Sequence, residues 1–208
     1  MADYKNIIKH YETCFVRHGD TSKGMDWPDE LENYKRFDVM LDVIRNNGIE
    51  STLLDFGCGT SHLKEYIIDN KIQNITYSGC DLSKTFVECS RKKFPETAYF
   101  ELDLLKDSEQ LPSYDYIICN GVFTEKQSLS FDEMWEYFKS MVHILYSKTK
   151  KGIAFNVMSK AVDWEREDLF HLPTDLLINF MTKELSRNFI IRNDYGLYEY
   201  TVYLYKKG

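Results

Sequence analysis

Residues 51–66, STLLDFGCGTSHLKEY, decide the fold of this chain, because a short apolar run there turns sharply into a helical pattern. Gly57 and Gly59 follow the run directly. Glycine lacks a Cβ atom, so it allows a tight turn and lets a ligand come close to the main chain. The stretch therefore predicts a strand at 51–56, a turn that can receive a ligand, and a helix at 61–70.

The same alternation of strand and helix continues through the chain. A capping box at Ser130–Glu133 predicts the start of a long helix. Further strands are expected at 75–80, 98–102, 115–119, 152–157, 188–195 and 198–205, and further helices at 3–15, at 83–94, at 174–186 and from Asp26-Trp27-Pro28 to Gly48.

Strands separated by helices pair in parallel through right-handed crossovers, whereas the short link at Gly196 makes the last two strands an antiparallel hairpin. The expected fold class is α/β. We predict a three-layer Rossmann-like sandwich around a seven-stranded, mostly parallel sheet whose last strand is antiparallel.

The composition excludes several classes of protein. The 208 residues suffice for one ordinary domain, and 43% apolar residues can bury a core. A net charge of -7, from 26 basic and 33 acidic side chains, argues against a surface that follows a nucleic-acid backbone. No apolar run approaches the roughly 20 residues of a membrane span, and the first residues lack the apolar core of a signal peptide. We therefore expect a cytoplasmic protein with no membrane partner.

The cysteines form no CxxC pair and are odd in number; they are Cys14, Cys58, Cys80, Cys89 and Cys119. These features indicate reduced thiols, and we expect all five to be packing side chains. Their spacings are not those of a zinc site, so no metal is expected.

Polar residues or glycines stand at four successive strand ends. In parallel sheets, ligands bind beyond the carboxyl ends of the strands. Asp81 ends the second strand, where a carboxylate can accept hydrogen bonds from ribose hydroxyls, and Asp103 follows the third, where it can accept from an exocyclic amine. Asn120 and Gly121 follow the fourth. Each residue alone could simply begin a turn, but together with Gly57 and Gly59 they favour a ligand site.

Two cofactor classes suit such a site, the nicotinamide dinucleotides and S-adenosylmethionine. The dinucleotide fingerprint requires a third glycine where this chain has His62. Asp55, beside the glycine turn, suits a ligand with an ammonium group, which S-adenosylmethionine carries at its amino-acid end. The residues therefore favour S-adenosylmethionine.

Four segments, LLDFGCGTS, YSGCDLS, FELDLL and YDYIICNGVF, resemble the motifs of the class I S-adenosylmethionine-dependent methyltransferases. The closing NFIIRNDYGLYEYTVYLYKK is similar to the last two strands of that family. The resemblance covers the chain from about residue 51. It implies the strand order 3-2-1-4-5-7-6 with an antiparallel seventh strand, S-adenosylmethionine as cofactor and S-adenosylhomocysteine as product.

The resemblance also implies a set of cofactor-binding residues. Those at the methionine end are Asp55, Gly57, Cys58 and Gly59; Asp81 would hold the ribose, with Leu82 beside the adenine; Asp103 would meet the adenine amine, with Leu104 alongside; and Asn120, Gly121 and Val122 would border the methyl group. The family often has a third glycine where this chain has Ser61, which implies a looser backbone contact there.

Residues 1–48 are interpreted as a helical cap or lid and residues 49–208 as the methyltransferase domain. The segment HGDTSKGMDWPDELENYKRF is similar to the leader of small bacterial methyltransferases of metabolite or sugar pathways. That similarity makes Trp27, Tyr34 and Arg36 candidates for the lid. Arg36 could pair with the methionine carboxylate or be a solvated helix residue, and Tyr34 is expected in the core.

The predicted function is methyl transfer to a small-molecule acceptor by in-line displacement. DNA-base methyltransferases usually carry Asn/Asp-Pro-Pro-aromatic after the fourth strand, whereas this chain has Asn-Gly-Val-Phe from Asn120, which argues against DNA as partner. Glu125 and His171 are candidate general bases, although each could be an ordinary surface residue. The alternatives are a non-catalytic S-adenosylmethionine-binding or scaffold subunit and an NAD-dependent dehydrogenase. The acceptor and the oligomeric state stay open.

Overall fold

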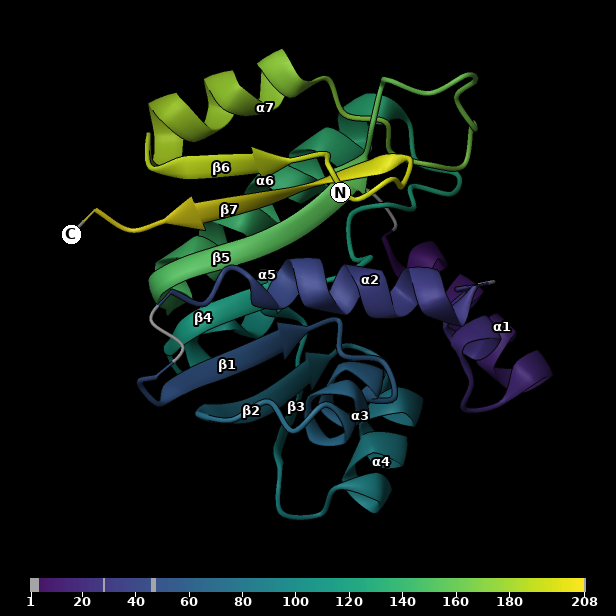
Figure 1. Cartoon of the computed structure of the whole chain (residues 1–208). Coiled ribbons are helices and arrows are strands. Elements are labelled where there is room, and N and C mark those ends of the chain that lie inside the picture. The colour runs from purple at the N-terminus through teal and green to yellow at the C-terminus, as the bar shows by residue number, and fades with distance from the viewer. Residues whose placement is uncertain (1–3, 28, 46–47, 208) are drawn as a thin grey trace.

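A seven-stranded sheet forms the middle layer of the molecule, in the order β3-β2-β1-β4-β5-β7-β6 (Figure 1). The structure is a computed structural model that describes residues 4–27, 29–45 and 48–207. Strand β7 is antiparallel to β5 and β6, and the other neighbours pair in parallel. The predicted strand order, parallel pairing and closing hairpin are confirmed. The strands are β1 Ser51–Phe56, β2 Ile75–Asp81, β3 Ala98–Glu101, β4 Tyr114–Cys119, β5 Thr149–Met158, β6 Phe189–Arg192 and β7 Glu199–Tyr205.

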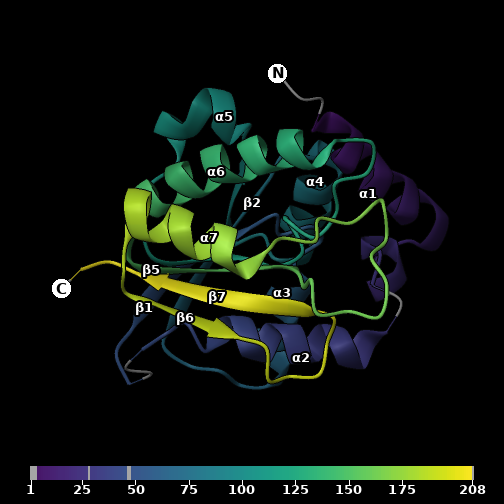
Figure 2. The ribbon, with the colours of Figure 1, turned by 90° about the horizontal axis from the view of Figure 1, so that it is seen from above.

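Helices cover both faces of the sheet, as the view from above shows (Figure 2). They are α1 Lys5–His18, α2 Glu30–Leu41, α3 His62–Asp69, α4 Lys84–Lys93, α5 Leu104–Asp107, α6 Phe131–Lys148 and α7 Thr174–Phe180, with short turns η1 Ser22–Met25, η2 Ser108–Gln110 and η3 Met181–Leu185. None of these described helices is both long and apolar enough to cross a membrane.

Each central strand contributes side chains to two separate cores. In β1, Leu53 packs with α2 and α3, whereas Leu54 packs with α6 on the opposite face. Successive side chains of a strand point to opposite faces, so a strand that is covered on both sides must be apolar throughout. This requirement explains why the apolar runs predicted the central strands so well, β1 among them with its predicted bounds of 51–56.

The start and the buried face of α2 differ from the prediction. Asp29 caps the helix, because its carboxylate accepts hydrogen bonds from the backbone N–H groups of Leu31 and Glu32. The predicted start at Asp26-Trp27-Pro28 is therefore wrong for Asp26 and Trp27, while Pro28 lies outside the described residues. The predicted end at Gly48 is also wrong, since the helix ends at Leu41.

Two large apolar side chains of α2 face solvent. Leu31 is 76% exposed and Tyr34 is 39% exposed, so Tyr34 is not the core residue that we expected. The buried face contains Phe37, as the helical spacing of apolar residues indicates, and also Asn33 and Arg36. Asn33 and Arg36 are thus buried, although the pattern of apolar side chains predicts that polar and charged residues of this helix face solvent.

A buried ion pair connects α2 to the start of β7. The Arg36 Nε–H donates to Glu199 Oε2 over 3.0 Å, and the two side chains are 10% and 2% exposed. The Asn156 amide donates to the other oxygen of Glu199 over 2.9 Å, and its own oxygen accepts from the Gly121 N–H over 2.8 Å. Elements at both ends of the chain therefore fix the position of the turn after β4.

We expect Arg36→Ala to lower the free energy of unfolding by about 3–5 kcal/mol, because it leaves the Glu199 charge buried without its partner. The matched control is Lys84→Ala, which removes an exposed pair with Glu88 and should cost about 0–1 kcal/mol. Urea unfolding of both variants measures the difference. Equal losses would contradict a structural role for the buried pair.

Candidate functional site

The turn between β1 and α3 is held against the end of β2. The backbone N–H groups of Gly57 and Cys58 both donate to the Cys80 carbonyl, over 2.8 and 3.2 Å. The Gly59 N–H donates to Asp81 Oδ2 over 2.9 Å, and the Ser83 N–H donates to Asp81 Oδ1 over 2.8 Å. The Asp81 carboxylate thus fixes the glycine turn before any ligand binds.

Both glycines of this turn are required by backbone conformation and by space. Gly57 and Gly59 have φ values of 75° and 52°, in the left-handed region that favours glycine. A Cβ on Gly57 would lie 2.4 Å from Val122 Cγ2, and one on Gly59 would lie 2.8 Å from Met25 Sδ. The turn is therefore packed between the end of β4 and the N-terminal segment.

Ser61, where the family often has glycine, also adopts a left-handed conformation, with a φ of 68°. Its buried hydroxyl shares hydrogen bonds with the Ser90 hydroxyl at 2.8 Å and the Tyr99 hydroxyl at 2.9 Å. These contacts hold a serine in a conformation that usually requires glycine. The side chain points into this hydrogen-bond network.

The strand ends surround one cavity, which encloses about 1110 Å³ of space, its open mouth included. Eleven of the twelve predicted cofactor residues line it: Asp55, Gly57, Cys58, Gly59, Asp81, Leu82, Asp103, Leu104, Asn120, Gly121 and Val122. The structure therefore brings residues from four strand ends together around a single space. Arg36 is the exception.

Arg36 lies behind the wall of the cavity. Its guanidinium pairs with Glu199 and lies over the Trp27 ring, 4.3 Å from the ring centroid. The Trp27 ring in turn covers Gly121, where a Cβ would lie only 2.5 Å from Trp27 Cζ2. Arg36 therefore positions the Trp27 ring. It does not line the cavity, where we expected it to pair with the methionine carboxylate of the cofactor.

Two carboxyl groups that face the cavity have raised pKa values. Burial raises the pKa of Asp55 to about 7, although the Tyr77 hydroxyl donates to Asp55 Oδ2 over 2.7 Å and opposes the shift. Burial also raises the pKa of Asp81 to about 6, against the lowering effect of its backbone hydrogen bonds. A cationic ligand group beside Asp55 would favour the ionised form.

Asp103 has the opposite balance. Burial raises its pKa, but hydrogen bonds from the Tyr4 hydroxyl at 2.7 Å and the Lys106 ammonium at 2.9 Å outweigh burial and hold the pKa below its usual range. Both contacts use Oδ2. Asp103 is thus ionised at neutral pH and also ties α1 to this side of the cavity.

Two buried amide oxygens in the cavity wall have no hydrogen-bond partner among the described residues. They are Asn33 Oδ1 and Asn120 Oδ1, and Asn33 is only 1% exposed. A buried acceptor without a donor costs about 1–3 kcal/mol, so a ligand that donates hydrogen bonds would remove a penalty. Sequence reasoning missed Asn33, although it precedes Phe37 and Met40 at the helical spacing of the buried face.

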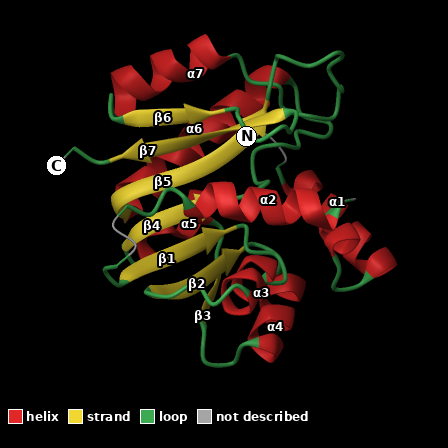
Figure 3. Ribbon diagram, in the orientation of Figure 1, coloured by secondary structure: helices red, strands yellow, loops and turns green. Residues whose placement is uncertain are grey.

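The candidate bases differ in their surroundings. His171 is buried, and both ring nitrogens contact the chain: Nδ1 lies 2.6 Å from the Ser159 carbonyl, and Nε2 accepts from the Arg166 N–H at 3.3 Å. It therefore holds the long loop between β5 and α7 together (Figure 3). Glu125 is also buried, and desolvation raises its pKa to about 7. Neither is the surface residue that the sequence allowed.

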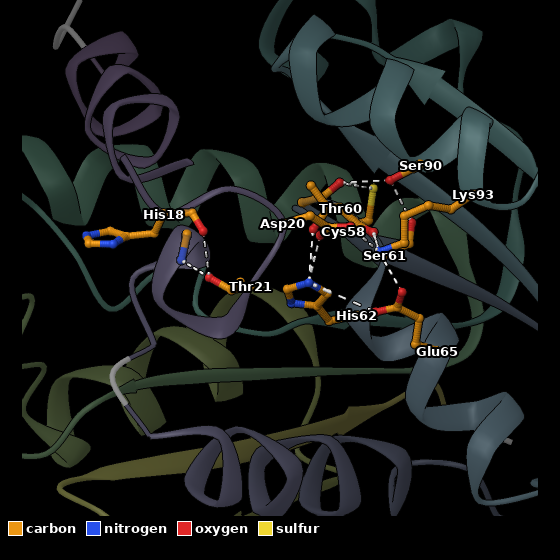
Figure 4. A network of polar contacts seen from close by, with 12 residues as sticks. His18, Asp20, Thr21, Cys58, Thr60, Ser61, His62, Glu65, Ser90 and Lys93 are labelled. Atoms are coloured by element: carbon orange, nitrogen blue, oxygen red, sulfur yellow. Dashed lines mark hydrogen bonds and ion pairs between the residues drawn. The ribbon is translucent and has the colours of Figure 1, made fainter. Parts of the chain in front are cut away.

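A polar network ties the N-terminal segment to the glycine turn (Figure 4). One oxygen of Asp20 lies 2.9 Å from His62 Nε2 and the other accepts from the Lys93 ammonium at 2.8 Å. The same ammonium contacts Glu65 at 2.7 Å. His62, which replaces the third glycine of the dinucleotide fingerprint, thus begins α3 with its ring held by Asp20.

The match to known proteins agrees with this geometry. Residues 54–147 match the family model described as a methyltransferase domain. A relative from Mycobacterium tuberculosis, Rv1506c, carries a provisional methyltransferase name and is 26% identical over 155 residues, which are 73% of this chain and 91% of the relative. The chain contains a methyltransferase domain of the S-adenosylmethionine-dependent kind.

Solved structures of methyltransferases share the whole fold. Magnesium protoporphyrin IX methyltransferase from Synechocystis PCC 6803 with bound S-adenosylmethionine aligns with a TM-score of 0.68 at 17% identity, over 100% of this chain and 99% of that one. The S-adenosylhomocysteine complex gives 0.71 at 15%, over 99% and 100%. The plantazolicin methyltransferase BpumL gives 0.61 at 14%, over 99% of this chain and 91% of that one. These identities are low, so the alignments establish the fold.

The cavity of this methyltransferase fits S-adenosylmethionine, its cofactor. The turn at Gly57 and Gly59 lines the cavity with main chain, Asp55 offers a carboxylate to an ammonium group, and the orphan oxygens of Asn33 and Asn120 can accept from a ligand.

We expect Gly121→Ala to destabilise this methyltransferase more than Gly196→Ala. Both glycines are left-handed, with φ values of 77° and 72°, but only Gly121 has a neighbour, Trp27, within 4 Å of the added Cβ. In the control, Gly196→Ala, the free energy of unfolding should fall by about 1–2 kcal/mol, because alanine disfavours the left-handed conformation. In Gly121→Ala it should fall by about 1–3 kcal/mol more, because the added methyl group overpacks against Trp27. Urea unfolding distinguishes them, and equal losses would show that Trp27 does not pack there.

Proposed function

We propose that this enzyme methylates a small-molecule acceptor by in-line displacement. The observation that carries the proposal is that the N-terminal segment roofs the cofactor cavity. Tyr4, Ile8, Tyr11, Met25 and Trp27 line the same space as the strand ends. A roofed cavity favours a small acceptor over a polymer, and the net charge of -7 also disfavours a nucleic acid.

We further propose that residues 1–48 act as the cap and residues 49–208 as the methyltransferase domain. Within the cap, α1 and η1 lie beyond the carboxyl ends of β1 and β2, on the right of Figure 1. Helix α2 instead packs on the sheet through Phe37 and Met40. The covering function therefore belongs to α1 and η1, and α2 provides the support that holds Trp27 through Arg36.

The methionine end of the cofactor is proposed to lie along the glycine turn. Asp55 would pair with the ammonium group, because its carboxylate is buried and its hydrogen-bond and charge partners among the described residues are the Tyr77 hydroxyl and the Asp81 carboxylate. Gly57, Cys58 and Gly59 would present main chain to the same group. Asn33 Oδ1 would accept a hydrogen bond from the opposite wall.

The adenosine end is proposed to lie between the ends of β2 and β3. Asp81 retains lone pairs for the ribose hydroxyls beyond its two backbone contacts. Leu82 and Leu104 would pack against the adenine. Asp103 would accept from the adenine amine while it also holds Tyr4.

The methyl group is proposed to face the end of β4. The bound sulfonium supplies an electrophilic methyl carbon, so the chain has to align the acceptor and exclude water. Asn120, Gly121 and Val122 line this part of the cavity, and Trp27 covers Gly121. Rigid placement of Gly121 through Asn156 serves that alignment.

Two of the similar structures support a small-molecule acceptor by their names, which specify magnesium protoporphyrin IX and plantazolicin as what those enzymes methylate. The main rival is a protein of this fold that holds S-adenosylmethionine without turnover. Conversion of labelled S-adenosylmethionine to S-adenosylhomocysteine separates the two.

We expect the purified protein to transfer the labelled methyl group to a component of a small-molecule extract, and not to DNA or RNA. The control is Gly57→Val, which fills the cofactor cavity and should abolish transfer. Binding of the cofactor without transfer to any fraction of the extract would favour the non-catalytic alternative.

The affinity for S-adenosylhomocysteine should depend on pH through Asp55. Its pKa of about 7 means that at lower pH the carboxyl must lose a proton before it can pair with the ammonium group. The Kd should therefore fall by up to about tenfold per pH unit as the pH rises from 5 to 7, and then level off. Isothermal titration calorimetry from pH 5 to 7.5 measures this profile.

In Asp55→Asn, the Kd should stay constant above about pH 6. The Asp81 carboxyl group, whose pKa is about 6, should account for the weaker pH dependence below that value. The ligand control is 5′-methylthioadenosine, which lacks the amino-acid end and should show no component that depends on Asp55. If Asp55→Asn keeps the slope between pH 6 and 7, the proposed ammonium contact is wrong.

A further inference from the structure

Three side chains with metal-ligating atoms meet between α1 and the end of η1. Within the part of the chain that the structure describes, His10, Cys14 and Asp26 are the one group of three such residues whose ligand atoms all lie within 4.8 Å of one another. His10 and Cys14 are four residues apart on α1, so they share one helix face. Asp26 follows η1 in a left-handed conformation, with a φ of 59°.

The distances suit a tetrahedral ion after small adjustments. Cys14 Sγ lies 3.9 Å from both His10 Nε2 and Asp26 Oδ1, and His10 Nε2 lies 2.8 Å from Asp26 Oδ2. In zinc sites the Zn–S bond is about 2.3 Å long, and the Zn–N and Zn–O bonds are about 2.0–2.2 Å long. Tetrahedral angles then place the sulfur atom about 3.5 Å from the nitrogen and oxygen ligands, and place those two ligands about 3.4 Å from each other. Shifts of roughly half an ångström, within side-chain freedom at partly exposed positions, would suffice.

The donor set identifies the class of ion. One imidazole nitrogen, one thiol sulfur and one carboxylate oxygen form a mixed set that suits Zn²⁺ and its borderline neighbours, whereas Mg²⁺ and Ca²⁺ prefer oxygen alone. Asp26 and Glu125 both bring negative charge near Cys14, and Arg17 is the positive group that acts on it. The local charge therefore favours a cation.

We propose that His10, Cys14 and Asp26 bind a divalent transition metal ion of the Zn²⁺ type and so fasten the roof of the cofactor cavity. The residues beside the ligands, Tyr11 and Met25 among them, line that cavity. An ion held by α1 and by the chain after η1 joins the two segments of the roof. The three protein ligands leave a fourth position for water or a ligand.

Binding replaces the contacts present without metal. The ion forms one bond each to nitrogen, sulfur and oxygen, and the Cys14 thiol proton goes to solvent. The neutral His10 ring moves its proton from Nε2 to Nδ1, so the hydrogen bond between His10 and Asp26 is lost. No electron transfer is required. The site is independent of the acceptor proposed above, since metal binding is measured without methyl transfer.

The test is titration of the metal-free protein with Co²⁺, followed by competition with Zn²⁺. We expect one equivalent of Co²⁺ to produce a sulfur-to-metal charge-transfer band in the near ultraviolet, and Zn²⁺ to remove it. Cys14→Ser should abolish the band, and His10→Ala should weaken binding at least tenfold. The matched controls are Cys89→Ser on α4 and His18→Ala at the end of α1, which should bind like the unmodified protein.

Thermal unfolding with and without Zn²⁺ adds a second readout. The melting temperature should rise with Zn²⁺ in the unmodified protein and in Cys89→Ser, but not in Cys14→Ser. Circular dichroism of each variant without metal confirms that it is folded. The proposal is overturned if no stoichiometric band forms, if the band survives in Cys14→Ser, or if Cys89→Ser removes it.

Discussion

The structure of the site depends on the hydrogen bonds that the half-buried Asp81 carboxylate accepts from two backbone amides. The Gly59 N–H and the Ser83 N–H converge on it from the first and second βα turns. A buried carboxylate is costly unless donors surround it, so the two turns and the carboxylate fix each other's positions. The glycine turn, the adjoining strand ends and the cavity between them are arranged around this contact, and the carboxylate keeps lone pairs for a ligand.

The second constraint comes from the N-terminal segment, which turns the open edge of a sheet into a roofed cavity. Its attachments are polar and widely spaced: Tyr4 bonds Asp103, Asp20 bonds both His62 and Lys93, and Trp27 stacks under a guanidinium. One acid that lines the cofactor cavity, Asp103, therefore also holds its covering.

Most of the sheet could be predicted from the sequence because a strand buried on both faces must be apolar along its whole length. The same reasoning failed on α2, where Arg36 is buried because Glu199, distant in sequence, neutralises it. It also misjudged Cys14, which lies beside His10 and Asp26 at the edge of the roof and not in a core. The partner that decides the burial of Arg36 is 163 residues away, so no local pattern reveals it, whereas the partners of Cys14 are near in sequence and an apolar count does not register them.

By itself, the sequence determined the central strands, the glycine turn and the acids at the strand ends, because hydrophobic period and backbone conformation are local properties. The strand order followed from the resemblance of its motifs to a known family. Eleven of the expected residues meet around one cavity for that reason. Only the tertiary structure decided that Arg36 supports Trp27, that Asn33 presents an unpaired oxygen and that α1 covers the site. Those features require two distant segments to meet, and the energy of such a contact is not encoded in either segment alone.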